Sequence, residues 1–187
     1  MSRAPALTAV FVLLCLALYV SDSQQWSIYN RQFATQGWRF FTASFSHYNF
    51  SHLIPNVAVL LVLGSLFEFE NHKFELVFLM FIVTLSTVTF LHFYLPEYDT
   101  FAGISCLNYA LIGWIVCREG RRYFVGVSAT MLLLVSYEIY VVAYESKQQY
   151  TGIIPVWQLH LLAFFQGVIF FVLQRVLLKS YWSRIGS

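Results

Sequence analysis

Long apolar stretches alternate with short polar ones along the whole chain. Several of these stretches are shorter than the ~20 residues that a helix needs to span a bilayer, and polar residues gather in the short ones. Helices of this kind begin below the membrane surface, inside the protein. The pattern predicts an all-α membrane protein, a bundle of six transmembrane helices that run from Pro5 to Val20, His52 to Phe69, Phe74 to Leu95, Gly103 to Cys117, Tyr123 to Tyr144 and Val156 to Leu178.

The first apolar segment has a second interpretation. Arg3 before it and the small residues of "SDS" after it are features of a cleaved secretory signal. The sequence "LYVSDSQQ" is a poor small-x-small cleavage site, however. We therefore favour a first transmembrane helix over a signal.

Composition agrees with a membrane protein of one domain. Of the 187 residues, 59% are hydrophobic and only 11% are charged, whereas soluble domains carry roughly 25% charged residues. No Pro/Gly/Ser-rich linker, block of charge or internal repeat divides the sequence. We therefore expect residues 1–187 to form a single domain. The three cysteines lie in apolar segments, which suggests neither a disulfide framework nor a thiolate metal cluster.

The basic residues predict the orientation of the helices. If the N-terminus is cytoplasmic, three of the 11 Lys and Arg residues, Arg31, Arg39 and Lys147, fall on the outer side and the rest on the inner side. Such an excess marks the cytoplasmic side of a membrane protein. Both termini are therefore expected in the cytoplasm. The net charge of +2 follows from this asymmetry, and no basic patch indicates binding to nucleic acid.

In this orientation, three segments place polar residues at one depth on the outer side. His52 and Asn56 begin the second segment, Ser105 begins the fourth, and His160 lies about one turn into the sixth. For Ser105 alone, a hydrogen bond between helices, worth on the order of 0.6 kcal/mol, is a sufficient explanation. His160 is different, because an ionisable residue inside the membrane is costly and indicates function.

These residue types fit acyl transfer. A serine hydroxyl becomes a nucleophile when a base such as a neutral imidazole takes its proton, and the resulting oxyanion needs preorganised donors. His52 and Asn56 are spaced i, i+4 on one helix face and can supply donors together with the backbone N–H of Ser105. No Asp or Glu is placed to orient His160, so a Ser–His dyad fits better than a triad.

Small residues accompany the histidine of the sixth segment. Ala163 and Gly167, in "HLLAFFQG", form a small-xxx-small face that allows close approach of a neighbouring helix. A histidine held at such a contact can reach a serine on the facing helix.

Four stretches of the sequence match motifs of one known family. "GWRFFTASFSHYNFSHLIPN" contains a Trp-Arg pair and the pattern H-x4-H-x3-N, and "GSLFE" is similar to the close of the following helix. "GISCLNYALIG", which begins at Gly103, is similar to G-x-S-G followed by Tyr-Ala and a later Gly, and "HLLAFFQG" to H-x2-G-x3-G. Together these stretches resemble the rhomboid intramembrane serine proteases.

The resemblance implies a role for each polar residue of the site. Ser105 is the nucleophile and His160 the base, Tyr109 stacks on the His160 ring, and His52 and Asn56 line the oxyanion site. No cofactor or metal is implied. The length of the chain and the spelling "HYNFSH" resemble most the rhombosortase branch, which is associated with C-terminal Gly-Gly anchoring tails of exported bacterial proteins.

Two positions depart from the family pattern. Cys106 stands where a glycine follows the nucleophile, and Ala163 stands where the first glycine follows His160. Cys106 adds a side chain beside the expected oxyanion site. This change favours the alternative of a catalytically inactive rhomboid-like scaffold that binds transmembrane clients.

We therefore expect an intramembrane serine endopeptidase in a bacterial inner membrane, with its active site open to the periplasm. Its partners would be membrane-anchored protein substrates and the lipid bilayer. A histidine-ligated metal or haem protein is a rival hypothesis, motivated by the five histidines. The spacing of these histidines is not that of the usual ligand sets.

Overall fold

The computed structural model describes the chain as two compact units, Met1–Asn108 and Tyr109–Ser187. The predicted fifth segment, Tyr123 to Tyr144, lies almost entirely outside the described residues, and the single-domain organisation stays a prediction. The described positions are 5–21, 24–33, 35–69, 72–119, 125, 129, 136, 139, 140 and 156–185.

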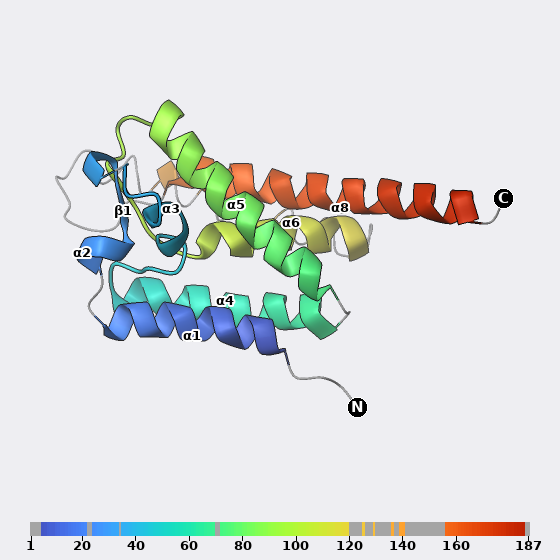
Figure 1. Ribbon diagram of the computed structural model, residues 1–187, viewed down its shortest axis with the longest axis horizontal. Coiled ribbons are helices and arrows are strands. Elements are labelled where there is room, and N and C mark those ends of the chain that lie inside the picture. The colour runs from blue at the N-terminus through green and yellow to red at the C-terminus, as the bar shows by residue number, and fades with distance from the viewer. Residues whose placement is uncertain are drawn as a thin grey trace. The chain divides into compact units, whose positions relative to one another are not determined.

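Helices make up most of the described chain (Figure 1). The first unit also has a short antiparallel ladder of two strands, which the sequence analysis did not predict. The elements are α1 (Ala6–Val20), α2 (Gln24–Ser27), β1 (Tyr29–Asn30), the 3-10 turn η1 (Arg31–Phe33), α3 (Arg39–Thr42), α4 (Phe50–Phe69), α5 (Lys73–Tyr94), β2 (Thr100–Phe101), α6 (Ser105–Glu119) and α8 (Trp157–Ile185).

Among the described residues, three helices are long and apolar enough to cross a membrane, namely Phe50–Glu68, Lys73–Tyr94 and Trp157–Val176. The apolar helix α1 is shorter, with 15 residues, and α6 also has 15. These helices lie within a few residues of the segments that hydropathy predicts. The expected class, an all-α membrane protein, is confirmed.

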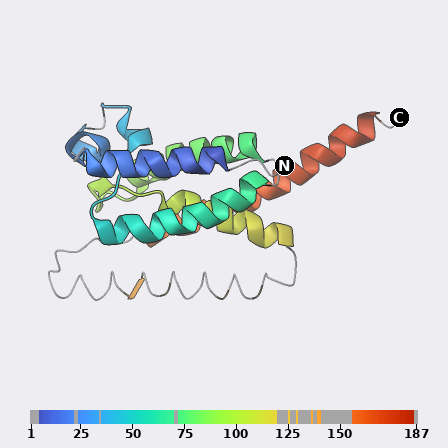
Figure 2. The same ribbon diagram turned by 90° about the horizontal axis from the view of Figure 1, so that it is seen from below.

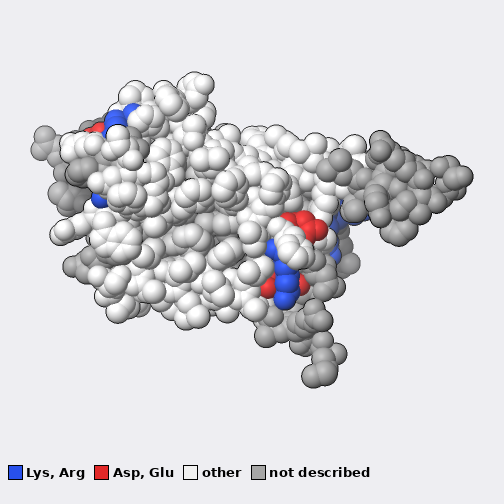
Figure 3. All heavy atoms as spheres, viewed as in Figure 1, with Lys and Arg blue, Asp and Glu red and all other residues white. Residues whose placement is uncertain are grey.

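The surface of the long helices suits contact with lipid. Large apolar side chains of α5 are exposed, among them Phe74, Phe78 and Phe81. Figure 3 shows a face on which charged residues gather in two groups, while the described surface between these groups carries no charged residue. A water-facing surface of this kind would be unusual, whereas hydrocarbon chains solvate it well.

A buried carboxylate joins α1 to α4, and the two helices run along each other (Figure 1 and Figure 2). Glu68, in the last turn of α4, accepts hydrogen bonds from the backbone N–H groups of Leu7 at 3.0 Å and Thr8 at 2.6 Å. The first N–H groups of a helix have no partner within it, and the helix dipole favours a negative charge there. Glu68 thus caps α1 and fixes the two helices as an antiparallel pair.

A buried arginine anchors the loop between α1 and α4. Arg39, only 4% exposed, donates to the backbone oxygens of Ile28 at 2.7 Å and Gln25 at 2.8 Å, and to the side-chain oxygen of Gln36 at 2.6 Å. A buried guanidinium needs such partners because it cannot lose its charge. The arginine of the Trp-Arg pair therefore has a structural role in the loop.

The same loop pairs with the segment that leads into α6. Tyr29 lies opposite Phe101 and Asn30 opposite Thr100 in the β1–β2 ladder. Three residues, Ala102, Gly103 and Ile104, separate Phe101 from Ser105. The ladder therefore holds the backbone just before α6 against the first loop.

A second arginine ties this loop to the end of α5. Arg31 donates to the backbone oxygens of His92 at 2.5 Å, Leu91 at 3.0 Å and Leu95 at 3.1 Å. The hydroxyl of Tyr29 lies 2.6 Å from Nδ1 of His92. The last carbonyls of a helix have no partner within it and carry partial negative charge, so a cation there is stabilising.

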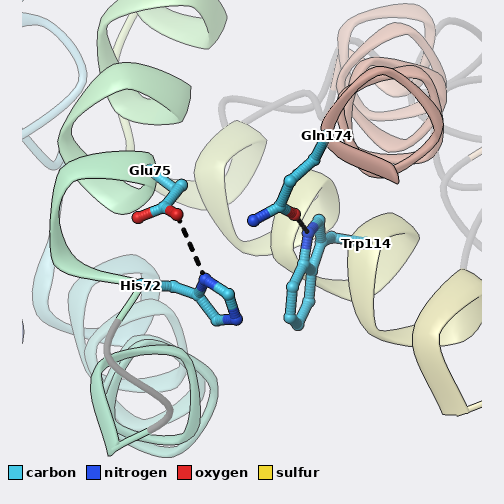
Figure 4. Close-up of polar contacts among 4 residues, drawn as sticks. All are labelled: His72, Glu75, Trp114 and Gln174. Carbon is cyan, nitrogen blue, oxygen red and sulfur yellow. Dashed lines mark hydrogen bonds and ion pairs between the residues drawn. The ribbon is translucent and has the colours of Figure 1, made fainter. Parts of the chain in front are cut away.

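In the second unit, α6 and α8 pack at very short range. A side chain at Gly113 would collide with the carbonyl oxygen of Phe164, and one at Gly167 with the carbonyl oxygen of Ala110. Glycine permits this approach of two backbones. Further along the pair, the indole N–H of Trp114 donates to the side-chain oxygen of Gln174 at 3.0 Å (Figure 4).

The Glu68 cap leads to a prediction of stability. Glu68→Gln keeps the shape of the side chain but removes its charge and one acceptor. The free energy of unfolding should fall by about 1–3 kcal/mol, the usual value of hydrogen bonds to a charged group. Thermal unfolding of the purified protein in detergent measures this.

Glu75→Gln is the matched control. Glu75 lies 3.3 Å from His72 at the start of α5, and both side chains are partly exposed (Figure 4). Exposed pairs of this kind contribute roughly 0–1 kcal/mol. Equal losses in the two variants would contradict the cap.

Candidate active site

Ser105 begins α6 directly after a turn that requires glycine. Gly103 has a φ of 126°, in a region that other residues rarely adopt. Its N–H donates to the backbone oxygen of Ala43 at 2.9 Å. A Cβ atom at Gly103 would lie 2.9 Å from Cε1 of His52 and 3.7 Å from Oγ of Ser105. The glycine therefore allows the imidazole of His52 and the hydroxyl of Ser105 to lie on one side of the turn.

Aromatic rings hold the His52 side chain. The ring of Tyr48 stacks on it, with centroids 5.9 Å apart and an angle of 17° between the planes, and the ring of His47 packs edge-on at 5.0 Å. The hydroxyl of Tyr48 donates to the hydroxyl of Thr100 at 3.1 Å. The first loop and β2 together therefore fix the orientation of His52.

His47 belongs to the frame of this loop. It is 1% exposed, and its Nδ1 lies 3.2 Å from the backbone oxygen of Phe45. Burial, together with the nearby His52, lowers the pKa of His47 to about 3. His47 is therefore neutral at physiological pH and places no positive charge beside His52.

Asn56 lies one turn after His52 on α4. Its side-chain Nδ2 donates to the backbone oxygen of His52 at 2.9 Å. Nδ2 of Asn108, on α6, donates to the backbone oxygen of Asn56 at 3.0 Å and lies 3.4 Å from its Oδ1. The first unit thus brings together the start of α6 and the two residues that the sequence predicts for the oxyanion site.

His160 lies in the first turn of α8, in the second unit. Its ring stacks on that of Tyr109, with centroids 4.4 Å apart and an angle of 15° between the planes. His160 is 9% exposed and Ala163, one turn later, is fully buried. Because Ser105 belongs to the first unit, its pairing with His160 stays a prediction.

Cys106 follows the serine on α6. Its side chain is buried, with 3% of its surface exposed. The thiol therefore occupies space that a glycine would leave open beside the start of the helix.

Sequence reasoning gave no role to two residues that touch the site, Tyr48 and Asn108. Tyr48 lies between the two histidines of the H-x4-H pattern, and Asn108 follows Ser105 by three residues, which places both on one face of α6. The helical spacing alone would have directed attention to Asn108.

Metal ligands form no cluster in the described part of the chain. None of its His, Cys, Asp and Glu residues make a group of three or more that could hold a metal ion. The rival hypothesis of a histidine-ligated metal gains no ligand set from these residues.

Comparison with known proteins identifies the family. The family model described as Rhomboid domain matches residues 34–175, well over half of the 187-residue chain. A search of curated proteins finds no match. The matched region contains Ser105, His160 and the long apolar helices α4 and α5, as expected for a multi-pass membrane protein. The chain therefore belongs to the rhomboid family.

Proposed function

We propose that this protein is a serine endopeptidase that cleaves membrane-anchored proteins in or near their transmembrane helix. Ser105 is the nucleophile and His160 the general base. Rhomboid proteins are generally serine proteases that act on membrane-embedded substrates. Membership of the family makes peptide-bond hydrolysis the first activity to test.

The ring stack of Tyr109 and His160 carries the proposal. Tyr109 follows Ser105 by four residues on α6, so the two side chains project from one face of the helix. The imidazole of His160 stacks on the Tyr109 ring, and the two ring centroids lie 4.4 Å apart. This stack supports His160 as the general base, because it involves the tyrosine that follows Ser105 by one turn of the same helix.

The proposed reaction needs only one base. His160 takes the proton from Oγ of Ser105 while Oγ attacks the scissile carbonyl carbon. His160 then gives that proton to the leaving amine as the C–N bond breaks, which leaves an acyl-enzyme. His160 then takes a proton from water as the water oxygen attacks the acyl carbon, and returns that proton to Oγ of Ser105 as the ester bond breaks, which releases the product acid.

Asn56 and His52 would stabilise the oxyanion of both tetrahedral intermediates. An amide Nδ2 carries two hydrogens, and one of those on Asn56 is directed at the backbone oxygen of His52. The second is available to a developing negative charge. The imidazole of His52 packs against Gly103, two residues before Ser105, which supports a second donor at the same place.

The alternative is an inactive rhomboid-like scaffold that binds transmembrane clients. Cys106 favours it, because a buried thiol replaces the glycine of the family motif beside the expected oxyanion site. The ring stack on His160 and the packing of His52 favour the protease, since a scaffold has no need of either.

We further propose that the substrates are exported proteins with C-terminal Gly-Gly anchoring tails. The resemblance of "HYNFSH" to the rhombosortase branch supports this. The location would be a bacterial inner membrane, with both termini cytoplasmic and the active site open to the periplasm. The distribution of the 11 basic residues supports that orientation.

Substitutions in the dyad test the protease. Ser105→Ala and His160→Ala should each abolish detectable cleavage, and the double variant should be no worse, because the two residues act as one unit. Asn56→Ala should lower kcat by roughly 10²–10³-fold. Turnover of a transmembrane substrate in detergent or liposomes, and labelling of Ser105 by a fluorophosphonate, measure these effects.

Ser86→Ala is the matched control for the serine. Its hydroxyl, on α5, donates to the backbone oxygen of Ile82 at 2.7 Å, and its loss should leave turnover unchanged. A Ser105→Ala protein that cleaves as well as the parent refutes the protease. A biological effect that needs the protein but neither Ser105 nor His160 would establish the scaffold.

Reporter fusions test the orientation. Fusions near Gln36, Glu97 and Lys147 should report the outer side, and fusions near Arg121 and the C-terminus the cytoplasm. The reason is the excess of basic residues near the latter positions. A cytoplasmic signal from Glu97 would place Ser105 at the wrong side of the membrane and reject the orientation.

Co-expression with exported proteins tests the substrate class. A protein with a Gly-Gly motif, an apolar helix and a basic C-terminal end should be shortened by the parent but not by Ser105→Ala. A matched tail in which both glycines are replaced by leucine should resist, because a helix without small residues unwinds less readily. Equal processing of the two tails would indicate a rhomboid protease without this preference.

A further inference from the structure

Asn108 connects α6 to α4 next to Ser105. It is the fourth residue of α6 and is only 4% exposed. Its Nδ2 donates to the backbone oxygen of Asn56 at 3.0 Å and lies 3.4 Å from Oδ1 of the same residue. A single side-chain amide of α6 therefore contacts both the backbone and the side chain of a predicted oxyanion residue.

These contacts fix the orientation of the Asn56 amide. Nδ2 of Asn108 can only donate, so it requires an acceptor, Oδ1, on the side of Asn56 that faces it. At the other end of the amide, Nδ2 of Asn56 donates to the backbone oxygen of His52 at 2.9 Å. A flipped amide would set donor against donor at one end and acceptor against acceptor at the other. Both contacts thus select the same orientation.

The environment of Asn108 does not suit a residue kept only for stability. Its Oδ1 is buried and has no hydrogen-bond partner among the described residues. An unsatisfied buried acceptor is unfavourable, and an apolar side chain of the same shape would avoid it. The useful end of Asn108 is therefore its Nδ2, which points at Asn56.

We propose that Asn108 is a positioning residue for the oxyanion donor Asn56. It holds the Asn56 amide so that the second hydrogen of Nδ2 already points toward the developing oxyanion before the reaction begins. Donors that are oriented in advance need no reorganisation in the transition state. The inference rests on the proposed protease function, and extends it to a position that the family motif does not specify.

A double-mutant cycle tests the proposal. Asn108→Leu removes the donor and keeps a similar shape, and it should lower kcat by roughly 10-fold or more with little change in KM, because a donor of this kind acts in the transition state. In a background of Asn56→Ala, the same substitution should change kcat by less than about threefold, since the residue through which it acts is gone. Turnover of a transmembrane substrate by the purified full-length protein measures both.

Thr87→Val is the matched control for a lost buried hydrogen bond. Thr87, on α5, is fully buried, and its hydroxyl donates to the backbone oxygen of Val83 at 2.7 Å. Thr87→Val should lower thermal stability at least as much as Asn108→Leu and leave kcat unchanged. A fall in kcat that follows stability equally in both variants would overturn the positioning role.

Asn108→Asp provides a second test that does not depend on the leucine variant folding. An ionised carboxylate cannot donate and would favour the flipped Asn56 amide, whereas a protonated carboxyl can donate. The kcat of this variant relative to the parent should therefore rise as the pH falls. A ratio that does not change with pH overturns the proposal.

The outcomes separate the two levels of inference. An active parent whose Asn108→Leu and Asn56→Ala effects multiply, or whose kcat is unchanged by Asn108→Leu, overturns the role of Asn108 alone. A parent that neither cleaves substrates nor reacts at Ser105 with a fluorophosphonate overturns the protease, and the role of Asn108 with it.

Discussion

Hydrocarbon offers no hydrogen bonds, and this constraint explains the polar contacts of the first unit. A buried polar group in an apolar medium must find its partner within the protein. Glu68 caps the start of α1, Arg31 caps the end of α5, and Arg39 donates hydrogen bonds to backbone oxygens within the first loop. Glu68 and Arg31 therefore connect segments that lie 60 or more residues apart in sequence, whereas Arg39 connects parts of one loop.

The polar start of α6 follows the same rule. An apolar segment that begins with Ser105 and Asn108 would be costly in lipid, but its first turn lies next to the loop and strand that the charged connectors hold in place. Gly103 adds the backbone freedom that the turn requires. The serine thus gains a polar environment without exposing the helix to hydrocarbon.

Sequence patterns predicted those parts of the structure that are determined by residues close together in the chain. Runs of apolar residues gave the helices, and the resemblance to rhomboid motifs pointed to the His52, Asn56 and Tyr109 positions. The β1–β2 ladder was not predicted, because its strands have two residues each, too few for an alternating pattern of polar and apolar residues. The Tyr48–Thr100 and Asn108–Asn56 hydrogen bonds were not predicted either. Each joins residues 52 positions apart through a single donor, and no local pattern in the sequence indicates such a contact.

The Glu68 cap also imposes an order on biosynthesis. A ribosome makes the chain from its N-terminus, so the first N–H groups of α1 exist well before their acceptor, which lies 60 residues after Thr8. Pro5, the residue before α1, provides no side-chain cap in the meantime. The start of α1 therefore lacks its carboxylate cap until the end of α4 has been synthesised. Pairing of α1 with the end of α4 therefore supplies the acceptor for those groups only after α4 has been made.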